Sequence, residues 1–345
     1  MTISAFWGEG SMLRAAKDTF FMLCLALSAD VITQNVSERI LIKSVIIIGG
    51  VIAACYIGLW LQQWICLPSL KEQRFTIQSI NRWGNDHAIN TSLLFGIPII
   101  ASWYFFSGKA ILLKLLLVAT MMLCGFLMVL SKSRGPLLSA MLVLFCISLY
   151  RRKKEDFLFM FISVGVVFLF FNYLDHPLLE RFKAESYRFY IWNKCLHLFK
   201  DYWLFGQGYG TSAEILLSGK PLASHAHNTY LEILRIGGIV GGVLFIYMIV
   251  TVFRFSYIHA GNRFFLYWML FGALCMVTNG RLPLLRPSHV IYIGVWIPFF
   301  LFYFSRNRVQ LMPLHVYTLQ NEKQSNDVDD VIAVQTVNLT DKIKT

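Results

Sequence analysis

The chain has 345 residues, of which 57% are hydrophobic and 14% are charged, and its mean hydropathy is +0.58. Because a soluble domain carries about 25% charged residues, this composition excludes a cytosolic enzyme and a disordered protein. The net charge is +12, yet the basic residues stand in short clusters between long apolar runs, which indicates membrane topology and not nucleic-acid binding. The composition therefore predicts an all-α, polytopic membrane protein.

Apolar runs suited to membrane spans follow one another along the chain. A bilayer needs about 20 apolar residues per helix, fewer where polar flanks reach the interface. The predicted spans are 40–62, 91–106, 110–130, 136–150, 157–174, 236–253, 264–277 and 289–304. The shorter run 19–29 is either a shortened or tilted first helix or, with Arg14 and Lys17 before it, a signal peptide. The sequence thus predicts eight or nine transmembrane helices in a membrane domain over 1–305.

Basic clusters orient these helices, because loops rich in Lys and Arg stay in the cytoplasm. Arg151–Lys154 is the densest cluster, and counting spans from it also puts Arg254–Arg263 and Arg306–Arg308 on the cytoplasmic side. The opposite, outer face then receives the connections 63–90, 131–135, 175–226 and 278–289. The tail 306–345 carries five basic and five acidic residues, and we expect it to be a disordered cytoplasmic extension.

Two arginines on the outer face suit an anionic ligand, because the planar guanidinium offers paired donors that match a phosphate. Arg134 lies in the short turn 131–136 between two apolar runs. Arg188 lies near the start of an amphipathic helical pattern over 187–205, whose apolar face is predicted to consist of Tyr187, Ile191, Cys195, Leu198 and Tyr202. The alternatives are that Arg134 only reaches from the membrane boundary to water, and that Arg188 neutralises Glu185.

The connection 175–226 is the only long one, and long ordered loops usually carry function. Its amphipathic stretch is expected to lie along the membrane surface. The glycine-rich segment Phe205–Gly210 after it predicts a flexible turn. Cys66 and Cys195 fall in the two longest polar connections and would pair only if both face an oxidising compartment.

The histidines at the end of this connection are candidates for acid–base chemistry. His225 and His227 are two residues apart, which fits neither one helix face nor a metal site, so no metal is expected. A histidine at a membrane boundary suits a general base, because its pKa lies near working pH. The alternative is that the two histidines lie in the N-terminal cap region of a helix, with hydrogen-bonded imidazoles. Glu232 follows inside an apolar run, where an ion pair with Arg235 is the default expectation.

Further signals lie beyond this segment. The closely spaced glycines of Gly237–Gly242 let another helix approach the backbone. Arg281 and Arg286, in the outer turn 278–289, either join an anion site or only anchor that turn.

Several of these motifs form a recognisable series. His227-Asn228 is followed after nine residues by Gly238 and after two more by Gly241. The other motifs are Ser133–Gly135, Ser186–Trp192 and Trp203–Gly208. In this order, and over about residues 40–305, they resemble the bacterial O-antigen ligases of the O-antigen ligase/polymerase superfamily. One departure is Trp192, where the ligases have an aliphatic residue.

The resemblance implies a membrane glycosyltransferase at the periplasmic face of the bacterial inner membrane. It would move O-polysaccharide from undecaprenyl diphosphate to a sugar of the lipid A–core, completing lipopolysaccharide without a metal or another cofactor. His227 would accept the proton of the acceptor hydroxyl, and Arg134 and Arg188 would hold the diphosphate. The possible supporting residues are His225, Asn228, Glu232, Arg281 and Arg286.

Two other functions remain open. An O-antigen polymerase shares the donor chemistry but extends the carrier-linked chain. A transporter with an anion site would place charges near the membrane midplane, whereas the cations and histidines here cluster at one boundary. The expected partners are the lipid-linked donor, the lipid A–core acceptor and membrane lipids, with no nucleic acid.

Overall fold

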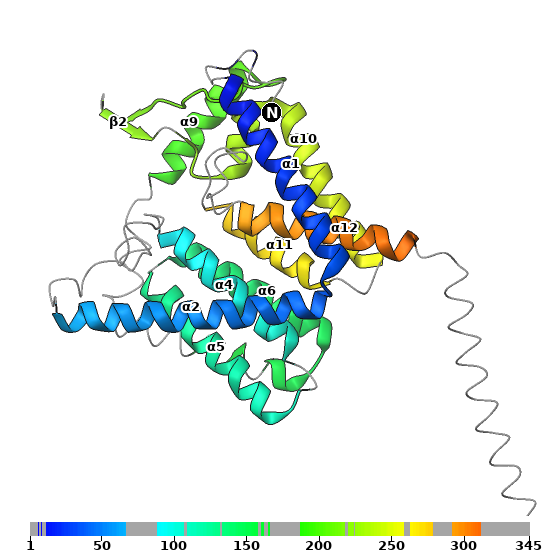
Figure 1. The fold of residues 1–345 in the computed structure, drawn as a ribbon. Coiled ribbons are helices and arrows are strands. Elements are labelled where there is room, and N and C mark those ends of the chain that lie inside the picture. The colour runs from blue at the N-terminus through cyan, green and yellow to red at the C-terminus, as the bar shows by residue number, and fades with distance from the viewer. Residues whose placement is uncertain are drawn as a thin grey trace, which may run out of the picture. The chain divides into compact units, whose positions relative to one another are not determined.

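The computed structural model describes residues 6, 8, 12–66, 88–106, 109–131, 133–157, 160–161, 165, 187–217, 220–223, 225–258, 263–278 and 292–311 (Figure 1). Most of the predicted span 157–174 and of the outer connections 63–90 and 278–289 lies outside these residues. The chain divides into two units, Met1–Phe302 and Tyr303–Thr345. The proposed limits of the membrane domain and of the tail stay predictions.

Helices account for nearly all of the described structure. They are α1 (Met12–Asn35), α2 (Glu38–Cys66), α4 (Ala88–Phe105), α5 (Ile111–Leu130), α6 (Arg134–Arg151), α9 (Arg188–Asp201), α10 (Thr229–Ile258), α11 (Arg263–Cys275) and α12 (Ile297–Leu311), with a π-helical turn η4 (Tyr292–Trp296) before α12. Apart from 157–174, each predicted span coincides to within a few residues with a described helix, so those helices are confirmed. The described part of the last predicted span, 289–304, falls on η4 and α12. Helix α10 begins earlier than the predicted span, at Thr229 instead of residue 236.

Several of these helices have the length and composition of membrane spans. Four of the described helices are long and apolar enough to cross a bilayer, over Glu38–Gln62, Ile111–Leu130, Arg134–Arg151 and Thr229–Arg254. Three shorter apolar helices cover Ile89–Phe105, Arg263–Cys275 and Ile293–Ser305. By these apolar helices the chain is a multi-pass membrane protein.

A short hairpin interrupts the helical architecture inside the long connection. Strand β1 (Ile215–Leu217) pairs antiparallel with β2 (Lys220–Ala223), and Leu217 lies opposite Lys220. This hairpin was not predicted from the sequence. The available signal was the two-residue link Ser218-Gly219 between two short apolar runs, which is typical of tight hairpin turns.

Helix α4 forms the centre of the helical packing, because it contacts α2, α5, α6 and α11. Its residues Ile100 and Ala101 are fully buried. Small residues allow the close contacts: a Cβ atom at Gly96 would lie 2.2 Å from the ring of Phe271, and one at Gly49 would lie 2.2 Å from Pro98. Tight packing of this kind holds helices together where lipid removes the hydrophobic driving force.

Basic residues gather at one end of this helical packing. The Arg151 guanidinium donates hydrogen bonds to the carbonyls of Trp103, at 2.7 Å, and Tyr104 at the end of α4. Arg263, the first residue of α11, lies 4.0 Å from the ring centroid of Tyr150. Two of the clusters that were predicted to share the cytoplasmic side therefore lie at the same end of α4, α6 and α11.

Helix α1 is longer than the apolar run 19–29 that predicted it. Its buried Asp18 accepts a 2.5 Å hydrogen bond from the hydroxyl of Tyr209, which is also buried. Tyr209 belongs to the long connection 175–226. The start of α1 therefore lies beside this connection.

Candidate functional site

The predicted base lies in the short segment between β2 and α10. The rings of His225 and His227 are half-buried, with centroids 4.0 Å apart and planes inclined at 47°. The backbone of His227 is left-handed, with φ +50°. A residue with a side chain seldom adopts this conformation unless its surroundings impose it, and such residues cluster at functional sites.

Asn228 fixes the chain directly after His227. Its Oδ1 accepts hydrogen bonds from the backbone N–H groups of Tyr230, at 3.0 Å, and Leu231, at 3.2 Å, so it caps the start of α10. The next residue, Thr229, donates its backbone N–H to the carbonyl of Met276 at 3.0 Å. The structure thus places Asn228 as a helix cap, which was the alternative reading of this segment, and ties the cap to the end of α11.

Glu232 and Arg235 form the expected ion pair, and both side chains also make hydrogen bonds that were not predicted. Two bonds join them, of 2.7 Å to Oε1 and 3.3 Å to Oε2, and both side chains are 1% exposed. Glu232 Oε2 also accepts the N–H of Ala226 at 3.0 Å. Arg235 donates further to Gln207 Oε1 at 2.6 Å and to the carbonyl of Thr211 at 2.8 Å. A buried pair with its polar atoms matched in this way avoids the penalty of an uncompensated charge.

The segment 203–208 is inserted into the hydrogen-bond ladder of α10. In an uninterrupted α-helix the N–H groups of residues 239 and 240 donate to the carbonyls of residues 235 and 236. Here Gly238, with φ +61° and ψ −163°, breaks that pattern. Four backbone hydrogen bonds of 2.8 to 3.3 Å join the released groups to the loop instead. The carbonyls of Arg235 and Ile236 accept from the N–H groups of Gln207 and Gly208. The N–H groups of Ile239 and Val240 donate to the carbonyls of Trp203 and Leu204.

This insertion corrects two predictions. The segment Phe205–Gly210 is not a flexible turn, because hydrogen bonds anchor it to α10. The glycines of α10 admit the backbone of this loop at Gly238, where a helix was expected to approach. The conformation at Gly238 requires glycine, and sequence alone does not reveal which of several glycines adopts it.

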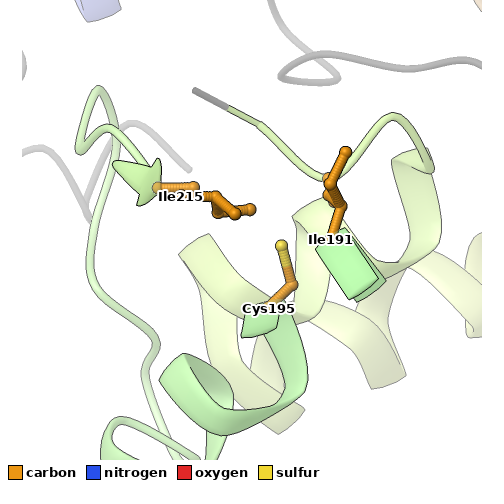
Figure 2. Close-up of a cluster of buried hydrophobic side chains, with 5 residues drawn as sticks. Ile191, Cys195 and Ile215 are labelled. Atoms are coloured by element: carbon orange, nitrogen blue, oxygen red, sulfur yellow. The ribbon is translucent and has the colours of Figure 1, made fainter. Parts of the chain in front are cut away.

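Helix α9 packs against the segment 225–227, which carries the two histidines, and its buried face confirms the predicted amphipathic helix. Ile191 and Cys195 project from α9 toward Ile215 of the hairpin (Figure 2) and are buried with Ala213 and Ala226. Because Ala226 lies between the two histidines, this cluster holds α9 against their segment. Burial, and secondly the charge of Glu232, raise the pKa of the Cys195 thiol to about 11. Cys195 is a free thiol, whereas the side chain of Cys66 lies outside the described part.

The amphipathic face is shorter than predicted. It was expected to extend from Tyr187 to Tyr202, but both of these side chains are more than half exposed. The reason is that α9 covers only Arg188–Asp201, so the two tyrosines lie just beyond its ends.

The two predicted phosphate ligands occupy equivalent positions in their helices. Arg134 is the first residue of α6 and Arg188 is the first residue of α9, and both are half-buried. In these two helices the N-cap side chains of Ser133 and Tyr187 make no capping hydrogen bond, and the first turns contain no acidic residue. A cation at the positive end of a helix dipole is disfavoured by about 0.3–1 kcal/mol, so both positions suit a bound anion.

Contacts bring the start of α6 and the start of α10 to the same turn at the end of α11. A Cβ atom at Gly135, next to Arg134, would lie 2.2 Å from the Thr278 hydroxyl. The bond from Thr229 to Met276 brings the residues after His227 to this turn as well. The start of α4 and the end of α5 meet close by, where the hydroxyls of Ser92 and Ser131 hydrogen-bond.

The other predicted anion-binding residues are not joined to this turn by the described contacts. Arg188 is positioned through α9, which packs on the segment of Ala226, and the described contacts do not join it to Arg134. Arg281 and Arg286 lie outside the described residues. Among the residues that are described, no three His, Cys, Asp or Glu side chains group as metal ligands.

Residues 117–246 match the family described as O-antigen ligase. This segment is similar to the O-antigen ligases. It contains α6, α9, the hairpin, both histidines and the kink of α10, so the family match covers the site described above. The resemblance of the sequence motifs to the O-antigen ligases is therefore confirmed.

A curated relative agrees with this family. The chain is 28% identical over 203 residues to a protein of Pseudomonas aeruginosa named O-antigen ligase. The aligned region covers 58% of this chain and 50% of that relative, so the chain spans about half the length of the relative it matches.

Proposed function

We propose that this chain is an O-antigen ligase that transfers O-polysaccharide from undecaprenyl diphosphate to a sugar of the lipid A–core. The observation that carries the proposal is the placement of His227. Its strained backbone is held between Ala226 and Asn228, and the residues after it contact the same turn of α11 as the residue next to Arg134. A base and a cation near one turn are what this transfer requires.

The proposed chemistry is a single displacement. The acceptor hydroxyl attacks the anomeric carbon of the first polymer sugar while the bond from this carbon to the diphosphate oxygen breaks. The electron pair leaves with the diphosphate, and the proton of the hydroxyl goes to the imidazole of His227. Because the hydroxyl attacks opposite the leaving group, the configuration at the anomeric carbon inverts.

Arg134 and Arg188 support the departure of the diphosphate in this proposal. Each arginine is the first residue of its helix, where the backbone N–H groups of the first turn also favour an anion. Charge that develops on the leaving group is then stabilised by groups already in place. We propose that no metal takes part, and activity of purified protein should persist in EDTA.

The proposed topology has eight or nine transmembrane helices in the bacterial inner membrane, with the site in the periplasm. The Arg151 and Arg263 end would face the cytoplasm. Cysteines introduced at exposed Lys200 and Lys153 test this orientation. A membrane-impermeant maleimide should label Lys200→Cys and not Lys153→Cys in intact spheroplasts, and the reverse pattern would contradict the proposal.

The test of function is a lipopolysaccharide gel from a deletion strain complemented with variants. His227→Ala should be present in the membrane but should leave lipid A–core without polymer, while intact long polymer accumulates on its carrier. His197→Ala, an exposed histidine on α9, is the matched control and should restore wild-type lipopolysaccharide. Normal capping by His227→Ala would remove His227 as the base, and lipopolysaccharide with a single repeat in the deletion strain would indicate a polymerase.

A further inference from the structure

We propose that Glu232 and Arg235 are positioning residues that hold the imidazole of His227 in its reactive orientation, an inference that rests on the proposed role of His227 as the base. They lie on the first turns of α10 and do not touch the reacting atoms in this proposal. Their effect passes through the backbone on both sides of His227.

Glu232 holds the chain before and after His227. Its Oε2 accepts the N–H of Ala226 at 3.0 Å, and its own N–H donates to the carbonyl of Asn228 at 3.0 Å. The three-residue segment from Ala226 to Asn228 is therefore fixed at both ends by one residue. With both ends held, the left-handed backbone of His227 has few other conformations available to it.

Arg235 fixes the carboxylate that makes this contact. Its guanidinium donates two bonds to Glu232 and further bonds to Gln207 and to the carbonyl of Thr211. The carboxylate can therefore not rotate away from Ala226 without breaking its own bonds to Arg235. The orientation of His227 depends in this way on the loop that is inserted into α10.

Stability alone does not account for this arrangement. A buried ion pair can often be replaced by well-packed apolar residues with no loss of stability. An apolar pair, however, cannot accept the N–H of Ala226 or bind Gln207. The function that requires these two charged residues is the directional control of the segment that carries His227.

The first test is the steady-state rate of transfer in proteoliposomes supplied with purified polymer-linked carrier and lipid A–core. If the imidazole of His227 is no longer held in its orientation, proton transfer slows, but the contacts to the diphosphate stay intact. Glu232→Gln and Arg235→Lys should therefore lower kcat about ten- to hundred-fold, with the KM for the donor within about twofold of wild type. Asp156→Asn is the matched control, because Asp156 is also buried and lies 3.8 Å from Arg151 at the other end of α6. It should retain the wild-type kcat.

The second test observes the ring itself, independently of activity. In protein labelled with ¹⁵N-histidine, the imidazole signals that disappear in His227→Gln belong to His227. These signals should shift or broaden in Glu232→Gln and stay unchanged in Asp156→Asn. Gln207→Ala, which removes one acceptor of Arg235, should give a smaller change of the same kind and serves if Glu232→Gln does not fold.

The outcomes separate the two proposals. If the His227 signals in both Glu232→Gln and Gln207→Ala match wild type, the positioning role is overturned whether or not the chain is a ligase. A fall in kcat no larger than that of Asp156→Asn overturns it as well. If His227→Ala remains active, the proposed base is wrong, while the imidazole signals still report whether Glu232 orients the ring.

Discussion

Gly206 and Gly238 meet so closely that neither has room for a side chain. A Cβ atom at Gly206 would lie 2.3 Å from the carbonyl of Ile236 and 2.5 Å from the nitrogen of Gly238. One at Gly238 would lie 2.3 Å from the carbonyl oxygen of Leu204 and 2.6 Å from the nitrogen of Gly206. Both glycines also have positive φ angles, so two independent reasons exclude a larger residue.

The first prediction concerns the kink of α10. Gly238→Ala should displace the loop 203–208, lower the thermal unfolding midpoint in detergent and abolish transfer, because the Cβ clash is with backbone. The neighbouring Gly237→Ala is the control, since a Cβ atom there meets nothing within 4 Å, and it should behave as wild type. Equal midpoints for the two variants would show that the close approach of Gly206 and Gly238 is not needed.

The second prediction concerns the contact between α1 and the loop. Tyr209→Phe leaves the buried Asp18 without its hydroxyl donor, and a lost partner of this kind costs about 1–3 kcal/mol. Thermal unfolding should report the loss, while Tyr247→Phe, an exposed tyrosine on α10, should unfold as wild type. Adding Asp18→Leu to Tyr209→Phe should recover part of the loss, and an additive double variant would contradict a direct interaction.

The third prediction concerns the cap of α10. Asn228→Ala removes the acceptor for two backbone N–H groups and should cost about 0.5–2 kcal/mol of unfolding free energy. Asn228→Ser should restore most of this stability, because serine is also a good N-cap. Asn193→Ala, on the exposed side of α9, should be neutral. Equal stability of the alanine and serine variants would show that the cap contributes nothing measurable.

The fourth prediction concerns the shape of the cation at the start of α9. Arg188→Lys keeps the charge but loses the planar fork, so we expect transfer to fall by about tenfold or more. Lys194→Arg, an exposed change on the same helix, should leave the rate unchanged. Transfer at the wild-type rate by Arg188→Lys would mean that Arg188 acts at most as a point charge.

Local patterns predicted much of this structure. Long apolar runs predicted the helices, and the spacing of Ile191 and Cys195 predicted the buried face of α9. The pairing of Glu232 with Arg235 followed from two opposite charges one turn apart in an apolar helix. Each of these features depends on residues within a few turns of one another, which is the range over which periodicity is informative.

Contacts between distant segments could not be predicted in the same way. Gln207 and Thr211 bind Arg235 across more than twenty residues, and Tyr209 binds Asp18 across 191. Nothing in the local sequence specifies those partners. The loop inserted at Gly238 was missed because several glycines stand close together, and only the three-dimensional structure shows which one leaves the helical conformation.

Because the backbone of His227 is left-handed, a substitution there can abolish activity without lowering the amount of folded protein. Glycine and asparagine adopt this conformation more readily than histidine does, by about 1–2 kcal/mol for glycine. Under the proposed function, alleles such as His227→Gly would lose transfer while folding at least as well as wild type. Bacteria carrying them would lack surface polymer yet keep a full complement of the protein in the membrane. An immunoblot would therefore score such a strain as normal, and only the lipopolysaccharide itself would reveal the defect.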